Sequence, residues 1–416
     1  MWENDIENKN YKAVMVWGID DGDSVAFIKP LTEWYGKAVS LYLHKSRDMQ
    51  VQVSAVAKKQ NGEITIGNDA VEKREYATHF MRSPESWERI SSTGVTYREH
   101  MSDYIRGMSE AILQNSSNRC GVMRHVMLQD DNGVAHWQKD EVLLVVSRPS
   151  SITWKGKKMR RQYAELISEA TGISNVIVTE ESRVAVFILL GIYDFREEIN
   201  LQGGALVLDF GSYTADATYL LPEKGSVNIC WELGDVQVER AMLEYIQQSD
   251  RWKRILADAA KSYGRERVLV GNDCSHAIFQ LRERKKDYFD GRLGERMFHM
   301  ELPITDKEDG IPIIDECGDL GLLGINYQVT SEMMQYALDG NEFDVRKDGH
   351  VVNHGTWKEN CRQFLDDVRQ TLEWKELSVQ TVIVTGSGSR MPCTVEMSVK
   401  AFPESLFLPM HRYTEW

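Results

Sequence analysis

The sequence predicts an α/β protein built from two related halves, on three observations. Residues 142–146, 159–171 and 176–178 have the patterns of a buried strand, an amphipathic helix and a second strand, the repeating unit of α/β folds. A strand, an aspartate, a glycine turn, a hydroxyl residue and a further strand occur twice, at 13–28 and 206–220. The 416 residues also suffice for two domains, each with its own core.

The hairpin at 206–220 carries the clearest chemical signal. Its apolar first strand ends on Asp209, and Gly211, which has no side chain, can bring its backbone N–H close to a phosphate. Ser212 and Thr214 can add hydroxyl donors, and Asp209 can hold a hydrated Mg²⁺ against the phosphate. The pattern predicts a phosphate clamp; the alternative is an ordinary hairpin turn that carries aspartate and glycine.

The hairpin at 13–28 repeats this pattern near the start of the chain. Its turn is Asp20-Asp21-Gly22-Asp23-Ser24, between apolar segments at 13–19 and 25–28. Two such hairpins suggest two halves that face one nucleotide. The alternative is again structural, because Asp-Gly is a common hairpin turn.

Hydrophobic periodicity and cap residues indicate the other elements of the first half. Thr96 with Glu99 forms a capping box, Gly172 is a helix stop, and the basic run 155–161 is expected to be the solvated start of a helix. The expected elements are strands at 51–57 and 63–67 joined by an Asn61-Gly62 turn, a helix from Thr96 past Ile112, a strand at 142–146, a helix at 159–171, a strand at 176–178 and a buried helix at 184–193.

In the second half, a glycine- and serine-rich turn at 386–392 stands between a strand and a helix. Such a turn invites a ligand through the helix N-terminus. The charged stretch 281–286 is expected to be the solvated face of a helix. The other expected elements are a helix that follows Leu233-Gly234-Asp235 and passes Ile246, a loop or small insertion at 303–323, a helix at 357–374, a strand at 381–385 and a last helix to Phe402.

The composition is typical of a soluble globular protein, with 42% hydrophobic and 27% charged residues and no apolar run of membrane-spanning length. The six cysteines include no C-x-x-C pair, which argues against zinc and a disulfide framework. His350 and His354 lack an adjoining glutamate and are expected on a surface turn. The acidic first residues are no secretory signal, so we expect a cytoplasmic protein, and the net charge of −14 argues against nucleic-acid binding.

Three glycine turns in this order resemble those of the actin-like ATPase superfamily, most closely the nucleotide-binding domain of the seventy-kilodalton heat-shock chaperones. Residues 18–24 look like its first phosphate motif, 209–216 like its second, and 385–392 like its adenosine motif, of which Arg-Met-Pro is the most specific part. Asp20-Asp21-Gly22 is also similar to plasmid-segregating actin-like proteins. Further matches are Leu233-Gly234-Asp235 to a Leu-Gly-Gly turn, and Glu283 with Lys286 to the pair that brackets adenine.

The resemblance covers about residues 13–402 and implies two ribonuclease-H-like lobes around a nucleotide cleft. It divides the chain into a polar tail at 1–11, lobe I at 12–205, lobe II at 206–402 with an inserted helical subdomain at about 240–330, and a tail at 403–416. No peptide-binding domain is expected.

The resemblance also implies roles for the matched residues. Asp20 and Asp209 would orient the waters of Mg²⁺, and Glu181, or its neighbour Glu180, would position or deprotonate the attacking water. The phosphates of ATP or ADP would lie against Gly22, Ser24, Gly211, Ser212 and Thr214, and the nucleoside against Glu283, Lys286, Gly386, Ser387 and Arg390. The matched motifs also count Asp23, Tyr213 and Gly234 among the cofactor-binding residues.

The chain departs from the family pattern at several positions. Asp23 stands where the family has a threonine, and Ser212-Tyr213 replaces two glycines. Arg82 is the nearest candidate for the family's phosphate-contacting lysine.

The resulting hypothesis is an ATP-binding, slowly ATP-hydrolysing, chaperone-like switch whose lobe closure is passed to a protein partner. Positioning a water without a trans-acting arginine gives slow hydrolysis, which suits a switch better than a metabolic catalyst. Two alternatives stay open: a nucleotide-dependent, filament-forming actin-like protein, and a catalytically degenerate pseudo-ATPase that serves as a scaffold. A small-molecule kinase is not favoured, because no second-substrate signature is present.

Overall fold

The computed structural model describes residues 11–20, 22–31, 38–44, 51–58, 62–71, 76–78, 80–91, 94–117, 120–149, 154, 156–192, 203–221, 225–264, 268–270, 275–306, 313 and 321–409. Several expected features lie outside these ranges. They are Asp21 of the first turn, Asn61 of the hairpin turn, Lys155, Tyr193, most of the segment 307–320 and the ends of the two tails, 1–10 and 410–416.

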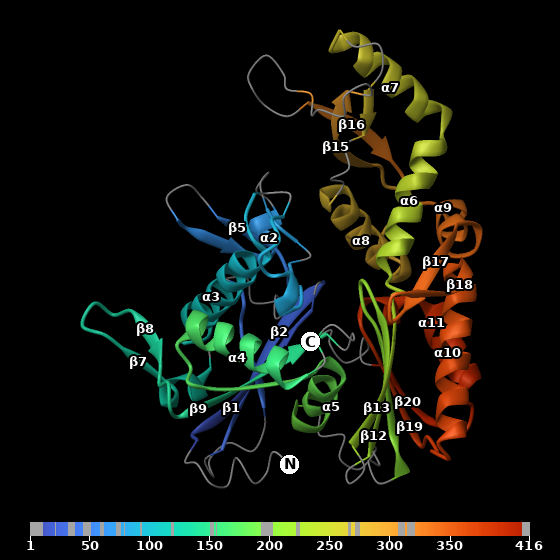
Figure 1. Cartoon of the computed structure of the whole chain (residues 1–416). Helices are drawn as coiled ribbons and strands as arrows, with labels where there is room; N and C mark the ends of the chain where they lie inside the picture. The colour runs from blue at the N-terminus through green and yellow to red at the C-terminus, as the bar shows by residue number, and fades with distance from the viewer. Residues whose placement is uncertain are drawn as a thin grey trace.

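Two mixed sheets with the same strand order form the centres of the two halves of this α/β fold (Figure 1). In each sheet the first three strands in the sequence form an antiparallel meander. Two later strands, parallel to the first strand of the meander, extend the sheet on that strand's free side. The first order is β10-β9-β1-β2-β3, with β4 beside β2, and the second is β13-β12-β11-β19-β20. The strands are β1 (Ala13–Ile19), β2 (Asp23–Pro30), β3 (Val39–Ser40), β4 (Val51–Val53), β9 (Val142–Arg148), β10 (Asn175–Glu180), β11 (Ala205–Phe210), β12 (Ala215–Leu221), β13 (Gly225–Trp231), β19 (Thr381–Thr385) and β20 (Leu406–Pro409).

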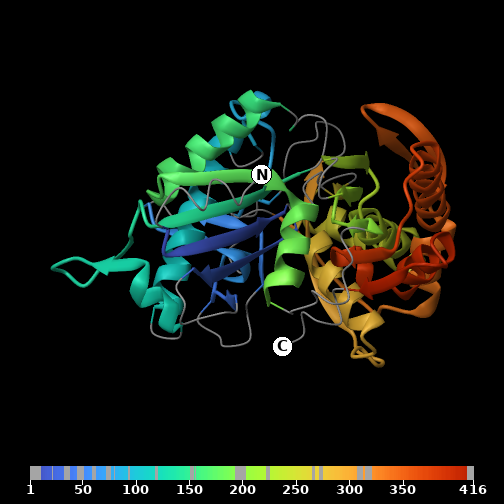
Figure 2. The ribbon, with the colours of Figure 1, turned by 90° about the horizontal axis from the view of Figure 1, so that it is seen from below.

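Helix α5 (Glu181–Ile192) lies between the two sheets, as Figure 2 shows from below. Its Val184 is buried in one cluster with Val16 of β1 and Val207 of β11, so this core is shared by both halves. Because neighbouring residues of a strand point to opposite faces, Trp17 lies instead in the outer core of the first half. The buried helix expected from residue 184 is present and begins at Glu181.

The outer face of the first sheet is covered by α3 (Tyr97–Ser116) and α4 (Lys157–Thr171), whose apolar faces join one core. The side chain of Thr96 caps α3 by accepting a hydrogen bond of 3.2 Å from the Glu99 N–H. Gly172 ends α4 with φ of 74°, a left-handed conformation that glycine adopts without strain. The described part of the basic run at the start of α4 is largely exposed, as expected.

The outer face of the second sheet packs on α10 (Trp357–Trp374) and α6 (Val236–Gln248). Thr356 and Glu359 form a complete capping box at the start of α10. Phe364 of α10 lies between the rings of Phe210 and Trp231, with ring centroids 6.0 Å and 5.8 Å apart. Since Phe210 follows Asp209 directly, α10 supports the end of β11 at which Asp209 lies.

Between α6 and α10 the chain forms a mixed extension, seen at the upper right of Figure 1. The expectation of a helical insertion was incomplete, because a three-stranded sheet accompanies the helices. The expectation of a loop at 303–323 was wrong at both ends, where buried alternate residues form strands. The elements are α7 (Asp250–Ser262), β14 (Val268–Val270), α8 (Ser275–Phe289), β15 (Phe298–Asp306) and β16 (Leu322–Tyr327).

The remaining elements are short and lie around the two sheets. His350 and His354 belong to a strand, so the expected surface turn was wrong, and His354 hydrogen-bonds Asp344 across the hairpin at 2.8 Å. No helix in the described ranges is long and apolar enough to cross a membrane. The elements are β5 (Val56–Lys58), β6 (Ile64–Ile66), α2 (Gly67–Val71), η1 (Pro84–Ser86), η2 (Gly121–His125), β7 (Met127–Gln129), β8 (Ala135–Trp137), α9 (Ser331–Gln335), η5 (Tyr336–Gly340), β17 (Glu342–Lys347), β18 (His350–Thr356), η6 (Ser387–Arg390) and α11 (Pro392–Ala401).

Truncating Phe364 tests whether α10 supports the second sheet. We expect Phe364→Ala to lower the free energy of unfolding by about 3–5 kcal/mol, because it leaves a cavity between two buried rings. Phe364→Leu, which fills most of that space, should cost less than about 1.5 kcal/mol. Urea denaturation of both variants gives the comparison, and equal losses would contradict this account.

Candidate functional site

A cavity of about 460 Å³ lies between the two halves and is lined by residues from both. This volume is within the range of small-molecule sites. Most of the residues that the sequence singles out line it, although they come from distant parts of the chain. They are Asp20, Asp23, Glu181, Asp209, Ser212, Glu283, Lys286, Gly386, Ser387 and Arg390.

Asp20 directly follows the last residue of β1, and Asp209 is the penultimate residue of β11, so each lies where the first strand of its sheet ends. Burial raises the pKa of Asp209 well above its ordinary value, and the charges of Asp20, Asp216 and Asp235 raise it further. A carboxylate in such a negative environment is stabilised by a cation. Within the described residues no group of three or more His, Cys, Asp or Glu side chains is placed to hold a metal ion.

The first turn is fixed by the segment that follows β4. The Ser54 N–H donates to the Gly22 carbonyl at 2.9 Å, and the Ser54 hydroxyl donates to the carbonyl of Asp20. Ser54 takes this place because the strand expected at 51–57 is broken into β4 and β5. Ser24 lies on the face of β2 opposite the cavity, where its hydroxyl is 2.9 Å from that of Ser54. Alternation along β2 therefore brings Asp23, not Ser24, to the cavity.

The second turn is held by the start of α6. The Asp235 N–H donates to the Gly211 carbonyl oxygen at 3.1 Å, and the Val236 N–H donates to the Ser212 carbonyl oxygen at 3.0 Å. Gly234 is packed so closely that an added Cβ would lie 2.0 Å from the Ser212 carbonyl oxygen. Gly234 therefore supports the turn by close backbone packing. Gly211, Tyr213, Thr214 and Gly234 are not among the residues that line the cavity.

Of the hydroxyls in this turn, only Ser212 faces the cavity. The hydroxyl of Thr214 is engaged elsewhere, since it donates to Asp216 at 2.7 Å. The two turns are also close to each other, because a Cβ added to Gly22 would lie 2.5 Å from the Ser212 hydroxyl oxygen.

The third glycine turn approaches the same strand end. Gly386 has φ of 84°, and an added Cβ would lie 2.5 Å from a carboxylate oxygen of Asp209 and 2.4 Å from the Phe210 carbonyl oxygen. Both the conformation and the space therefore require glycine here. Arg390, at the end of this turn, lies 3.4 Å from the carboxylate of Asp290.

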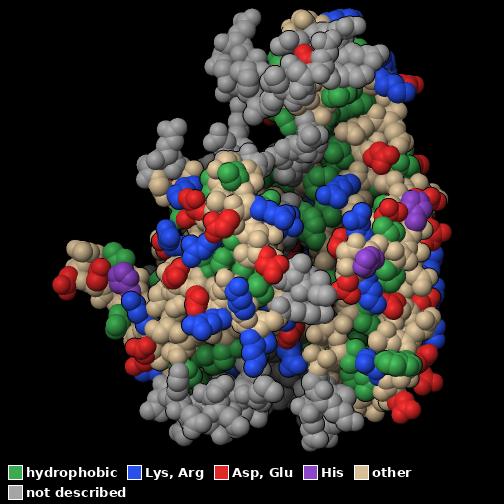
Figure 3. Space-filling model, viewed as in Figure 1, with side chains coloured by type: hydrophobic (Ala, Val, Ile, Leu, Met, Phe, Trp, Pro, Cys, Tyr) green, Lys and Arg blue, Asp and Glu red, His purple; other side chains and the backbone are tan. Residues whose placement is uncertain are grey.

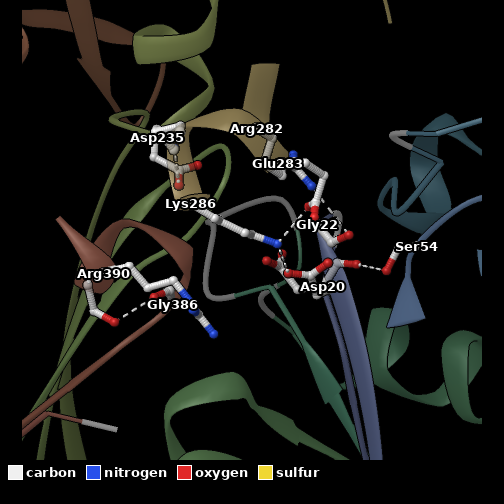
Figure 4. Close-up of polar contacts among 12 residues, drawn as sticks. Asp20, Gly22, Ser54, Asp235, Arg282, Glu283, Lys286, Gly386 and Arg390 are labelled. Atoms are coloured by element: carbon white, nitrogen blue, oxygen red, sulfur yellow. Dashed lines mark hydrogen bonds and ion pairs between the residues drawn. The ribbon is translucent and has the colours of Figure 1, made fainter. Parts of the chain in front are cut away.

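Helix α8 reaches across from the second half to the first turn, as Figure 4 shows. The Lys286 ammonium lies 3.1 Å from Glu283 and 3.5 Å from Asp23. The Arg282 guanidinium lies 3.5 Å from the Gly22 carbonyl oxygen and is 4% exposed. The charged stretch 281–286 was expected to be solvated; that expectation was wrong.

Lys285 of the same stretch is buried between two carboxylates of the second half. Its ammonium lies 2.7 Å from Asp235 and 2.6 Å from Glu239, and all three side chains are at most 2% exposed. This network ties α8 to the start of α6, and hence to the second turn.

Of the two neighbouring glutamates, only Glu181 faces the cavity. The carboxylate of Glu180 is bound by Arg148 at 2.7 Å and by Arg183 at 3.1 Å. Glu181 therefore fits the role of a glutamate that acts on a ligand, and Glu180 an ion-pairing role.

Arg82 is not brought to the cavity: it is exposed, and its guanidinium lies over the Tyr97 ring at 5.6 Å. Conversely, sequence reasoning missed Asn68, Ser147 and Asp290, which line the cavity. Ser147 hydrogen-bonds both the N–H and the carbonyl of Ile19, and its place at the end of a strand beside β1 was the available signal.

Neither a scan against protein-family models nor a search of curated proteins finds a match to this chain.

The space-filling view in Figure 3 shows Lys and Arg interspersed with Asp and Glu over the described part of the visible face.

Lys285→Met tests the buried ion network. Removing the cation leaves two buried carboxylates without their ion-pair partner, so we expect a loss of about 3–5 kcal/mol in the free energy of unfolding. The matched control is Lys261→Met, since that lysine is 81% exposed and its loss should change stability by less than about 0.5 kcal/mol. Equal effects in denaturant titrations would refute a structural role for Lys285.

Asp209→Asn should raise the melting temperature of the ligand-free protein at pH 7 by a few degrees, because it removes a charge that burial and its acidic neighbours oppose. Between the ordinary pKa of 3.8 and the raised pKa of the folded protein, only the folded state holds this proton. The contribution of Asp209 to stability therefore falls as pH rises through that window and is gone above it. Plotted against pH, the melting temperature of the wild type should fall through this window relative to that of Asp209→Asn. A constant difference between the two melting temperatures would contradict this account.

Proposed function

We propose that the chain is an ATP-binding switch that hydrolyses ATP slowly and transmits closure of its two halves to a protein partner. The observation that carries this proposal is the convergence of three glycine turns on one cavity. Gly22, Gly211 and Gly386 are far apart in the sequence, but their turns are close in space. A Cβ added to Gly22 would collide with Ser212 of the second turn, and one added to Gly386 would collide with Asp209 at the end of β11.

The proposed fold is two ribonuclease-H-like lobes, lobe I at 12–205 and lobe II at 206–402 with the extension at about 240–330 inserted. The repeated strand order supports it, since both sheets combine an antiparallel meander with two parallel strands in the same places. The cavity lies at the strand ends that carry Asp20 and Asp209. In α/β sheets, ligands commonly bind outside such strand ends.

In the proposed complex, the phosphates lie at the turns of β1–β2 and β11–β12, and the nucleoside lies between α8 and the turn of Gly386. Asp20 and Asp209 would hold Mg²⁺ through water, and bound there the ion would neutralise phosphate charge. The pKa of Asp209 supports this role: burial raises it, repulsion from neighbouring carboxylates raises it further, and a cation would offset both. Glu181, which faces the cavity, would orient the attacking water or accept its proton.

The switch follows from where α8 and α5 lie. Helix α8 belongs to the second half and contacts the first turn through Arg282 and Lys286, and α5 is buried against both sheets. A ligand that replaces the contacts of α8 would change the separation of the halves, which is a hinge-type transition. A protein partner that binds one separation better would then sense the nucleotide.

Calorimetric titration of the purified chain with ATP and ADP, with and without Mg²⁺, tests the proposal, followed by single-turnover hydrolysis. We expect Mg²⁺-dependent binding that Asp209→Ala abolishes. Glu181→Gln should retain binding but lower the hydrolysis rate about 10²–10⁴-fold, the usual contribution of a general base. The neighbouring Glu180→Gln is the control, and its hydrolysis rate should stay close to that of wild type.

The alternative functions are separate outcomes of the same experiment. Binding without turnover would favour a pseudo-ATPase scaffold. Nucleotide-dependent light scattering would indicate a filament-forming homo-oligomer. Absence of binding to either nucleotide would refute the proposed function and leave only the α/β fold.

A further inference from the structure

The first turn contains an acidic side chain, Asp23, that forms an ion pair with a lysine of the second half. The carboxylate of Asp23 lies 3.5 Å from the Lys286 ammonium, and the two side chains are only 27% and 20% exposed. Lys286 is shared, because it also lies 3.1 Å from Glu283. The charge of Lys286 is therefore balanced by two carboxylates of the chain itself.

Asp23 is held in its charged form by this environment. Burial by itself opposes ionisation, but the positive charges of Lys286, Arg282 and Arg390 outweigh it and lower the pKa of Asp23. Arg282 lies against the same turn, 3.5 Å from the Gly22 carbonyl oxygen. At neutral pH the turn thus presents a fixed negative charge beside the cations that face the cavity.

We infer that Asp23 is a specificity-determining residue, an internal anion that makes the site favour a nucleoside diphosphate over a triphosphate. This inference rests on the proposed nucleotide-binding function. A polyphosphate at the first turn has to share Lys286 with Asp23 and lies in the field of its carboxylate. The triphosphate carries the greater negative charge, so it is opposed more strongly than the diphosphate.

The test is the ratio of two dissociation constants, measured by calorimetry with Mg²⁺-ADP and with a non-hydrolysable ATP analogue and Mg²⁺. In the wild-type chain the analogue should bind more weakly than ADP. In Asp23→Asn, which keeps the shape and removes the charge, the analogue-to-ADP ratio should fall about tenfold. Asp23→Ser provides a second neutral variant, and melting curves check that both variants are folded.

The matched control is Asp287→Asn. Asp287 lines the same cavity, but its carboxylate lies 3.0 Å from Arg284 and not against Lys286. Removing its charge should leave the ratio unchanged.

A fall of the ratio in both Asp23 variants, with no change in Asp287→Asn, would support this inference. An unchanged ratio in both Asp23 variants, with wild-type binding intact, would overturn it and leave the proposed function standing. An equal fall in Asp287→Asn would also overturn it, because the effect would then belong to the overall charge of the cavity. Failure of wild type and all variants to bind either nucleotide would overturn the inference together with the proposed function.

Discussion

The packing of α5 between the two sheets is the constraint on which the site depends. This helix is apolar on the sides that meet β1 and β11, so both halves bury hydrophobic surface against one element. Since β1 and β11 hold equivalent positions in their sheets, their ends and the following turns open toward the same space. Burial of the strand end and the approach of the two carboxylates both oppose the charge of Asp209, and both raise its pKa.

The charged side chains of α8 contact both halves of the molecule. Lys285 stabilises the second turn from within the second half, whereas Arg282 and Lys286 on the same helix reach the first turn. One short charged segment therefore serves both the internal structure of the second half and its contact with the first. A charged ligand in the cavity would compete for the same side chains, and its binding would thereby be coupled to the position of α8.

Strong local signals made much of the fold predictable. The helix at 357–374 and the strand at 381–385 have the expected bounds, because a capping box, a regular apolar face and an apolar run before Gly386 act within a few residues. Long-range partners explain the errors: Lys285 is buried by Asp235, 50 residues away, and Arg282 contacts Gly22, 260 residues away. The break after β4, which places Ser54 at the first turn, likewise depends on contacts outside its own strand.

The sequence alone determined which residues stand at strand ends and glycine turns, because periodicity and the absence of a side chain are local properties. The resemblance of the three glycine turns to one family then predicted that Asp20, Asp209 and Gly386 lie in one site. Only the tertiary structure decided which side chains face the cavity. Strand alternation turned Ser24 away, ion pairs engaged Glu180, and α8 brought Lys286 to Asp23, since each outcome depends on atoms supplied by another part of the chain.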